Sequence, residues 1–249
     1  ILKDGNSGTD QSGQSNNYSV SGGTLTKTED NPSNVFCTLN PLNQTNSGAV
    51  FSNGNNKMTI SGLWLGINST LFMESGKYYW EIKYGSGNYD IGIAQLGTAA
   101  TQTSEISNPN HGFIGRKTGG YTLQQNGGQP YKVNANSNDG NYGSQASSGN
   151  ILMVAYDADN GKLFTGINGA WNNSSNPATG ANPMYTVTST EFYCPSLSVE
   201  SGSLETNFGN GYFGTTAVSS AGTNASGNGI FEYDVPTGFT ALSTKGLNL

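Results

Sequence analysis

Short apolar or alternating runs recur along the chain from about residue 28, and turn residues separate them. None of these runs keeps the 3.6-residue period that an amphipathic helix shows over ten or more positions. Many short strands with Gly and Asn between them are typical of a β-sandwich or barrel. The pattern therefore predicts an all-β protein with strands at Val35–Leu39, Lys57–Ser61, Leu71–Met73, Tyr78–Tyr84, Asp90–Ala94, Gly112–Ile114, Gly120–Leu123, Ile151–Ala155, Lys162–Ile167, Phe192–Val199 and Leu204–Phe208.

The clearest alternation is in SGKYYWEIKYGSGNYDIGIAQLG, residues 75–97. Even positions from 78 to 84 are aromatic or apolar, and they alternate with an odd set that includes Glu81. Successive side chains of a strand point to opposite faces. A Gly-Ser-Gly-Asn break at 85–88 precedes a second apolar run. We expect a β-hairpin with one buried face and with Trp80 in the core.

A second hairpin is predicted at 151–171, where an apolar run meets Asn160-Gly161 and another strand follows. Asn-Gly favours a tight turn because both residues tolerate positive φ. Asp157 and Asp159 in this turn have two interpretations, a calcium loop or acids that serve the turn itself. The later ligands and the closing glutamate of an EF-hand are missing, which favours turn acids.

The N-terminal residues 1–27 are polar and Gly/Ser-rich, and we interpret them as a linker or arm from a preceding region. Residues 28–249 form the predicted sandwich domain. Within it, residues 210–230 are a Gly/Ser/Asn-rich excursion.

Composition narrows the possible functions. Hydrophobic residues make up 33% of the 249 residues and charged residues only 10%, whereas aromatic residues reach 10%. Disordered chains are poor in aromatic residues, so a folded, loop-rich protein is expected. The net charge is -6 and Arg116 is the one arginine. Nucleic acid is therefore not an expected partner, because binding to phosphates needs clustered Lys and Arg. No apolar run has the length of a membrane span.

The two cysteines, Cys37 and Cys194, allow either one disulfide in an extracellular protein or two buried free thiols. We favour free thiols, because a core of this size has little need of a single bridge.

Five motifs in order resemble those of a SPRY domain. They are S-G-K-x-Y-W-E at 75–81, I-G-I-A at 91–94, D-x-D-N-G at 157–161, I-N-G at 167–169 and N-F-G at 207–209. The resemblance covers residues 30 to 249. It implies a two-sheet antiparallel β-sandwich related to the concanavalin-like jelly roll. It also implies a binding module without general catalytic residues, in which variable loops carry recognition, as is usual for loops on a rigid scaffold.

The flanks resemble SPRY-like domains of tailed-bacteriophage structural proteins, especially marine ones. The resemblance rests on DNPSNVFCTLNPL at 30–42, on Ser-Asn-Gly at 52–54, and on the ending with N-F-G, a Gly/Ser/Asn excursion and P-x-G-F-x-A-L-x-T. A weaker signal is LKDGNSGT at 2–9, which is similar to a piece found at junctions of phage fibre and decoration proteins. Ser243 departs from the phage pattern, in which a cysteine is common at that position.

The sequence offers little for catalysis. A Ser-His-Asp arrangement needs a histidine, and His111 is the only one. No serine has a G-x-S-x-G context, and no Cys/His cluster has metal-ligand spacing. Glucanases on the concanavalin-like scaffold carry E-x-D-x-E on a strand, which is missing here. We therefore expect no enzyme, no cofactor and no metal.

Loop residues remain as candidates for ligand binding. Trp64 and Trp171 lie among turn residues, where an indole could stack on a sugar or anchor a protein contact. Residues 108–128 hold His111, Arg116 and Tyr121, and the guanidinium could hold a carboxylated sugar or a partner's acid. The alternatives are that the tryptophans pack over sandwich ends and that Arg116 forms a surface ion pair.

The combined expectation is a non-enzymatic virion structural protein of a tailed phage, a tail or head fibre exposed at the virion surface. Its SPRY-like domain would attach to the host surface, with glycan as the favoured ligand and protein as the other possibility. One alternative is a capsid decoration or fibre protein that only associates with itself and with other virion proteins, with a homotrimer favoured. Another is a cellular SPRY module that binds a peptide.

Overall fold

The computed structural model describes residues 10, 14–17, 19, 21, 30–45, 47–95 and 112–248. Most of the predicted N-terminal arm and His111 lie outside the described residues. None of the helical segments in the described part is long and apolar enough to cross a membrane. The elements are β1 (Leu39–Gln44), β2 (Val50–Ser52), β3 (Lys57–Ile60), β4 (Leu65–Ser69), β5 (Lys77–Gln95), β6 (Gly120–Gln125), β7 (Tyr131–Asn134), β8 (Ser137–Asn141), β9 (Ile151–Asp157), β10 (Lys162–Ile167), β11 (Ala170–Trp171), β12 (Tyr185–Thr186), β13 (Tyr193–Asn207), β14 (Tyr212–Phe213), β15 (Thr216–Ala217), β16 (Thr240–Ala241) and the 3-10 turns η2 (Ile114–Arg116), η3 (Asn172–Ser174) and η4 (Gly246–Asn248).

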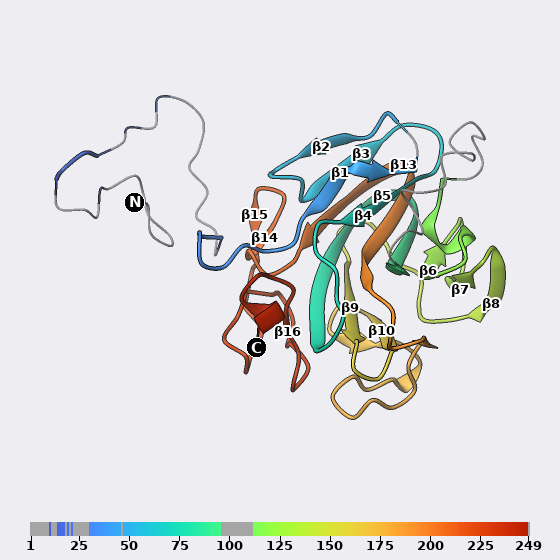
Figure 1. Ribbon diagram of the computed structural model, residues 1–249. Coiled ribbons are helices and arrows are strands. Elements are labelled where there is room, and N and C mark those ends of the chain that lie inside the picture. The colour runs from blue at the N-terminus through green and yellow to red at the C-terminus, as the bar shows by residue number, and fades with distance from the viewer. Residues whose placement is uncertain are drawn as a thin grey trace.

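Two long strands, β5 and β13, link the two layers of an antiparallel β-sandwich (Figure 1). In one layer the strand order is β1-β4-β13-β5-β6-β7-β8. In the other, β2 and β3 continue into β13, β5, β9 and β10, and β11 and β12 pair with β10. The expected all-β fold with an antiparallel sandwich is confirmed.

The predicted hairpin at 75–97 is wrong, because β5 runs as one strand of 19 residues. Both halves of β5 pair with the same strand, β13: Lys83 lies opposite Glu205, and Tyr89 lies opposite Val199. Between these halves β5 changes from one layer to the other, and the register of β13 shifts there. Gly87 allows the bend: its φ is +86°, and a Cβ would lie 2.3 Å from the carbonyl oxygen of Glu200. The glycines therefore permit a close crossing of two strands and do not form a turn.

The second predicted hairpin is confirmed as β9 and β10, which pair from Asp157–Lys162 to Leu152–Ile167. The connecting loop is residues 158–161, so it is longer than the tight turn expected from Asn-Gly. Of Asn160 and Gly161, only Gly161 has a positive φ.

Both faces of β5 are buried in its first half, whereas the alternation predicted one buried face. Trp80 is 1% exposed and lies in the core, as predicted. Tyr79 and Glu81 on the opposite face are also fully buried. The C-terminal segment, which carries the buried side chains of Phe231, Val235 and Phe239, covers this second face. The ring of Phe231 lies 4.9 Å from that of Tyr79, edge to face.

Several predicted strands shift or are absent. The predicted strand Val35–Leu39 begins only at Leu39, because residues 35–38 are irregular. The predicted strands Leu71–Met73 and Gly112–Ile114 do not form, and η2 begins at Ile114. The two predicted strands within 192–208 are one continuous strand, β13. The shortest strands, such as β11 and β16, have too few residues for a periodic signal.

The cysteines are both buried and unbridged. Burial raises the pKa of the Cys37 thiol, and it raises that of Cys194 to about 12. Both side chains therefore behave as small apolar core residues, as expected for free thiols.

Candidate functional site

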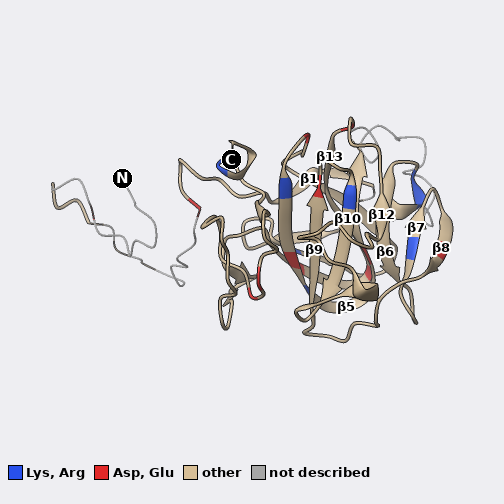
Figure 2. Cartoon of the chain, turned by 90° about the horizontal axis from the view of Figure 1, so that it is seen from below, with Lys and Arg blue, Asp and Glu red and all other residues tan. Residues whose placement is uncertain are grey.

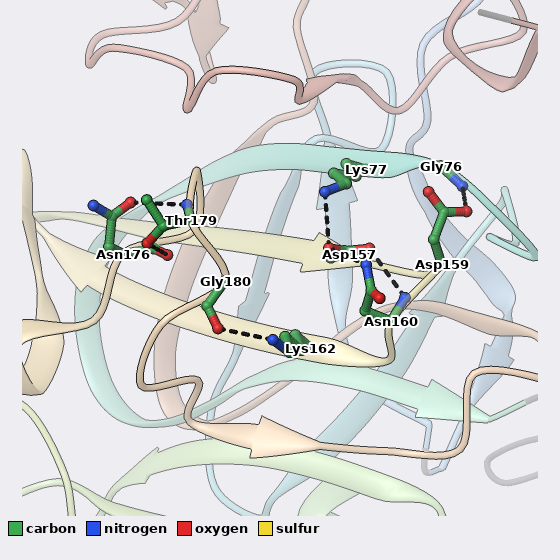
Figure 3. A network of polar contacts seen from close by, with 9 residues as sticks. All are labelled: Gly76, Lys77, Asp157, Asp159, Asn160, Lys162, Asn176, Thr179 and Gly180. Atoms are coloured by element: carbon green, nitrogen blue, oxygen red, sulfur yellow. Dashed lines mark hydrogen bonds and ion pairs between the residues drawn. The ribbon is translucent and has the colours of Figure 1, made fainter.

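The SPRY-like motifs around the β9–β10 loop form a structural network, the Asp157 brace (Figure 3). Lys77 Nζ lies 3.0 Å from the buried carboxylate of Asp157, which also accepts from the backbone N–H and the side-chain amide of Asn160. Asp159 accepts the backbone N–H of Gly76 at 2.8 Å. Asp157 and Asp159 therefore stabilise the β9–β10 loop, as predicted for turn acids. Among the described residues no cluster of three or more His, Cys, Asp or Glu could hold a metal ion.

Trp64 and Arg116 both contact Phe113. The rings of Trp64 and Phe113 are 5.3 Å apart, and the guanidinium carbon of Arg116 lies 5.9 Å from the Phe113 ring. Trp64 is only 7% exposed, although the sequence places it among turn residues. Its burial favours the packing interpretation, because a stacking platform needs an open ring face.

Tyr121 lies elsewhere, on the inner face of β6 at the edge of the core. It pairs with Ile93 in the ladder, and its ring meets those of Tyr185 and Tyr193 at 5.3 and 6.2 Å. Gly115 of η2 instead packs against Thr122, the next residue of β6, whose side chain points to the opposite face. Tyr121 and Arg116 are therefore on opposite faces of the same sheet and do not form one site.

Trp171 lines a cleft of about 670 Å³, which we call the Trp171 cleft. Trp171 ends β11, which follows the Asn168-Gly169 turn, and is half-buried; its ring and that of Tyr79 form a T-shaped pair with centroids 6.3 Å apart. Tyr233 contributes a second half-buried ring, which lies directly against Gly169. Besides these, the lining includes Met153, residues 220–223, Glu232 and Asp234.

Loop donors fix the two acids of the cleft. Glu232 accepts the backbone N–H of Ser219 at 2.6 Å and also its hydroxyl. Asp234 accepts the backbone N–H of Thr223 at 2.7 Å and its hydroxyl at 2.8 Å. These two bonds lower the pKa of Asp234, so the carboxylate is ionised at neutral pH. These bonds join residues 219–223 to residues 232–234, and the two segments together form one wall of the cleft.

A buried carboxylate holds this wall against the sandwich. Glu81 accepts the backbone N–H groups of Glu232 and Tyr233 at 2.9 and 2.8 Å. It also accepts the Tyr79 hydroxyl at 2.9 Å and, at 3.4 Å, the side-chain amide of Asn207. Burial raises the pKa of Glu81 to about 7, because the removal of water outweighs these four donors.

A second cleft, of about 580 Å³, lies beside the Asp157 brace and includes Lys77, Asp159, Phe239 and Thr240. Its charged side chains already have internal partners, and Lys77 Nζ lies 6.0 Å from the centre of the Phe239 ring. The Trp171 cleft is the stronger candidate, because two aromatic rings and two ordered acids converge there.

The sequence pointed to Trp171 but not to its partners. Tyr233, Glu232 and Asp234 lie in FEYDV at 231–235, directly after the Gly/Ser/Asn-rich excursion, and they are not among the residues predicted for the site. The usable signal was the alternation of Phe231, Tyr233 and Val235 with acids, which is typical of an extended segment with one buried side. Of the five predicted site residues, only Trp171 lies in this cleft, and His111 falls outside the described residues.

Charged residues are few and scattered along the strands and loops of the sandwich (Figure 2). Two ion pairs of the described residues, Lys57 with Glu205 and Lys77 with Asp157, join residues of neighbouring strands.

Comparisons with known proteins identify solved structures with a similar fold. No family model and no curated protein matches the sequence. Among solved structures, the TRIM65 PSpry domain matches with a TM-score of 0.50 and 15% identity, over 69% of this chain and 91% of that domain. The SPRY domain of human HERC1 matches with a TM-score of 0.47 and 14% identity, over 68% of this chain and 96% of that domain. A stonustoxin structure matches over 68% of this chain but only 28% of its own, with a TM-score of 0.45 and 15% identity. At such identities the likeness establishes the fold alone, and that fold is SPRY-like.

Proposed function

We propose that the chain is a non-enzymatic binding module and that the Trp171 cleft is its ligand site. The observation that carries the proposal is the convergence of Trp171, Tyr233, Glu232 and Asp234 in one open cleft. Exposed aromatic faces with a few fixed polar groups are typical of sites that recognise sugars or protein side chains. Cell-surface glycan is the favoured ligand, because the hydroxyls of residues 220 and 223 add hydrogen-bonding groups to the aromatic wall.

The absence of catalysis is part of the proposal and rests on the state of the acids. A glycosidase needs one carboxylic acid that stays protonated beside the sugar and a second that is ionised. Hydrogen bonds lower the pKa of Asp234 in the cleft. Glu81, whose pKa is raised, is fully buried behind the backbone of residues 232 and 233. Neither residue therefore suits the role of the proton donor.

The setting we propose is the surface of a tailed-phage virion, with the module in a tail or head fibre that attaches to the host. It is supported by the resemblance of residues 30–42 and of the C-terminal ending to phage structural proteins. We also propose that the chain associates with itself and with other virion proteins, with a trimer favoured. A decoration protein that only self-associates is the alternative function.

The ligand site is tested by the binding of the purified chain to arrays of bacterial surface polysaccharides. We expect binding that Trp171→Ala abolishes and Trp171→Phe partly keeps. Equal binding by the wild type and Trp171→Ala would remove the cleft from the proposal.

The setting is tested by gold-labelled antibody against residues 28–249 on particles purified from the source of the chain. Label at fibre tips supports attachment, and label spread over the capsid supports decoration. Particles without label would contradict the virion setting. Sedimentation of the purified chain separates a trimer from a monomer.

A further inference from the structure

The Trp171 cleft combines negative charge with aromatic surface in a way that restricts its ligand. Two of its lining side chains are acidic and two are aromatic. None of the described residues that line the cleft is a Lys or Arg. A neutral sugar needs no such excess of carboxylate, and a carboxylated sugar would be repelled by it.

The acids are free to act on a ligand as well as on the loop. Glu232 and Asp234 each take two hydrogen bonds from Ser219 or Thr223, which fix the carboxylates in place. An ionised carboxylate offers about four acceptor sites, so each keeps capacity for another donor. Because the loop bonds already hold the side chains, a ligand would not have to order them.

The aromatic rings offer a complementary contact. Trp171 and Tyr233 both line the cleft, and each is half-buried. The Trp171 ring lies at 70° to the ring of Tyr79, and the Tyr233 ring lies beside Gly169. The face of an indole or phenol ring attracts an ammonium group within about 6 Å. A sugar ring also stacks on such a face, whereas a neutral acetamido group offers the acids one N–H donor and no positive charge.

We propose that the Trp171 cleft recognises an ammonium-bearing sugar, with the amino group between Glu232 and Asp234 and the sugar ring on Trp171. This inference rests on the proposed function and specifies its ligand. A cleft of about 670 Å³ suits a short stretch of one to a few sugar rings. The hydroxyls of Ser220 and Thr223 lie in the lining, where they can bond sugar hydroxyls.

The test uses the full chain and two probes that differ only at nitrogen, the trimer of glucosamine and the trimer of N-acetylglucosamine. Calorimetric titration is done at a pH below the pKa of the amine. We expect the charged trimer to bind about tenfold more tightly, a preference that falls as salt screens the charges. Equal binding, or tighter binding of the acetylated trimer, would overturn the inference.

The variant Glu232→Gln/Asp234→Asn removes both charges and keeps the side-chain shapes. One oxygen of Asp234 accepts both bonds from Thr223, so an amide at position 234 keeps them. An amide at position 232 keeps the bond from the Ser219 backbone N–H and donates its NH2 to the Ser219 hydroxyl. The double variant should lose the preference for the charged trimer while retaining the melting temperature. The matched control, Glu74→Gln/Glu200→Gln, removes two charges outside the cleft lining and should keep the preference. Loss of the preference in the control would assign it to the net charge of the chain and contradict the cleft as its source.

A lysine tripeptide and its acetylated form make up a third arm. If the lysine peptide binds as tightly as the glucosamine trimer, the ligand is a basic protein segment and the sugar assignment is wrong.

The experiments distinguish failure of the ammonium inference from failure of the proposed binding function. Polysaccharide binding that needs Trp171 but is unaffected by Glu232→Gln/Asp234→Asn would refute the ammonium inference and leave the binding function standing. Absence of any Trp171-dependent binding would refute the function itself.

Discussion

The carboxylate of Glu81 accepts the backbone N–H of Tyr233 at 2.8 Å, across 152 residues of sequence. Through this bond and its neighbour at Glu232, the central strand β5 holds the wall of the Trp171 cleft. The carboxylate is fully buried, so the cleft depends on an acid that no ligand contacts.

Replacement of Glu81 by Gln should destabilise the protein at all pH values. Donors face both carboxylate oxygens, Tyr79 and Tyr233 on one and Glu232 and Asn207 on the other. An amide accepts on one side only, so one backbone N–H loses its partner, which costs about 1–3 kcal/mol. Urea unfolding measures this loss. Glu74→Gln at an exposed position is the control, and an equally small effect of both substitutions would contradict the role of Glu81.

The stability of the protein should fall as the pH rises from about 4.5 to about 7. The pKa of Glu81 is about 7 in the folded state against an ordinary value of 4.5, because burial disfavours the charge. A raised acid pKa means that the folded state binds the proton more tightly than the unfolded state does. The stabilising contribution is therefore complete below the unfolded-state pKa and is lost as the pH rises through the folded-state pKa.

The pH effect is isolated by a comparison of the wild type with Glu81→Gln across this range. Burial also raises the pKa of Asp90, to about 6, and that group shifts stability in the same direction in both proteins. The difference in unfolding free energy between the two proteins should shrink towards pH 8. A difference that stays constant with pH would show that Glu81 titrates normally.

The two loop tryptophans should behave differently when replaced by alanine. Trp64 is buried against Phe113, so Trp64→Ala should cost about 3–5 kcal/mol of stability. Trp171 is half-buried and lines the cleft, so Trp171→Ala should cost less stability and weaken ligand binding at least about tenfold. Thermal unfolding and polysaccharide binding, measured on both variants, separate the roles. Strong binding loss in a folded Trp64→Ala variant would contradict this division.

Gly169→Ala should damage the cleft. Gly169 has φ +84°, and a Cβ there would lie 3.0 Å from a ring carbon of Tyr233. Gly127 has a similar φ of +69° with no atom within 4 Å, so Gly127→Ala carries the backbone strain alone. We expect both variants to lose about 1 kcal/mol of stability but only Gly169→Ala to lose binding. Equal binding by the two variants would show that the position of Tyr233 does not matter.

The sequence by itself determined the β class, the β9–β10 hairpin and the burial of Trp80. These follow from short-range properties, the two-residue alternation of a strand and the positive φ that Gly161 allows, which act within a few residues. The order of the SPRY-like motifs added the sandwich, and the structural likeness to the TRIM65 domain agrees with it.

Only the tertiary structure decided that β5 continues through its glycines and that Tyr79 and Glu81 are covered. The glycine break has the local character of a turn, but both flanking halves pair with β13, and those ladder bonds keep the strand extended. The burial of Glu81 comes from residues 231–239, more than a hundred positions away in the chain. A local pattern shows which side chains share a face of a strand. Whether that face meets solvent or another segment depends on long-range packing, and the same packing assembles the Trp171 cleft.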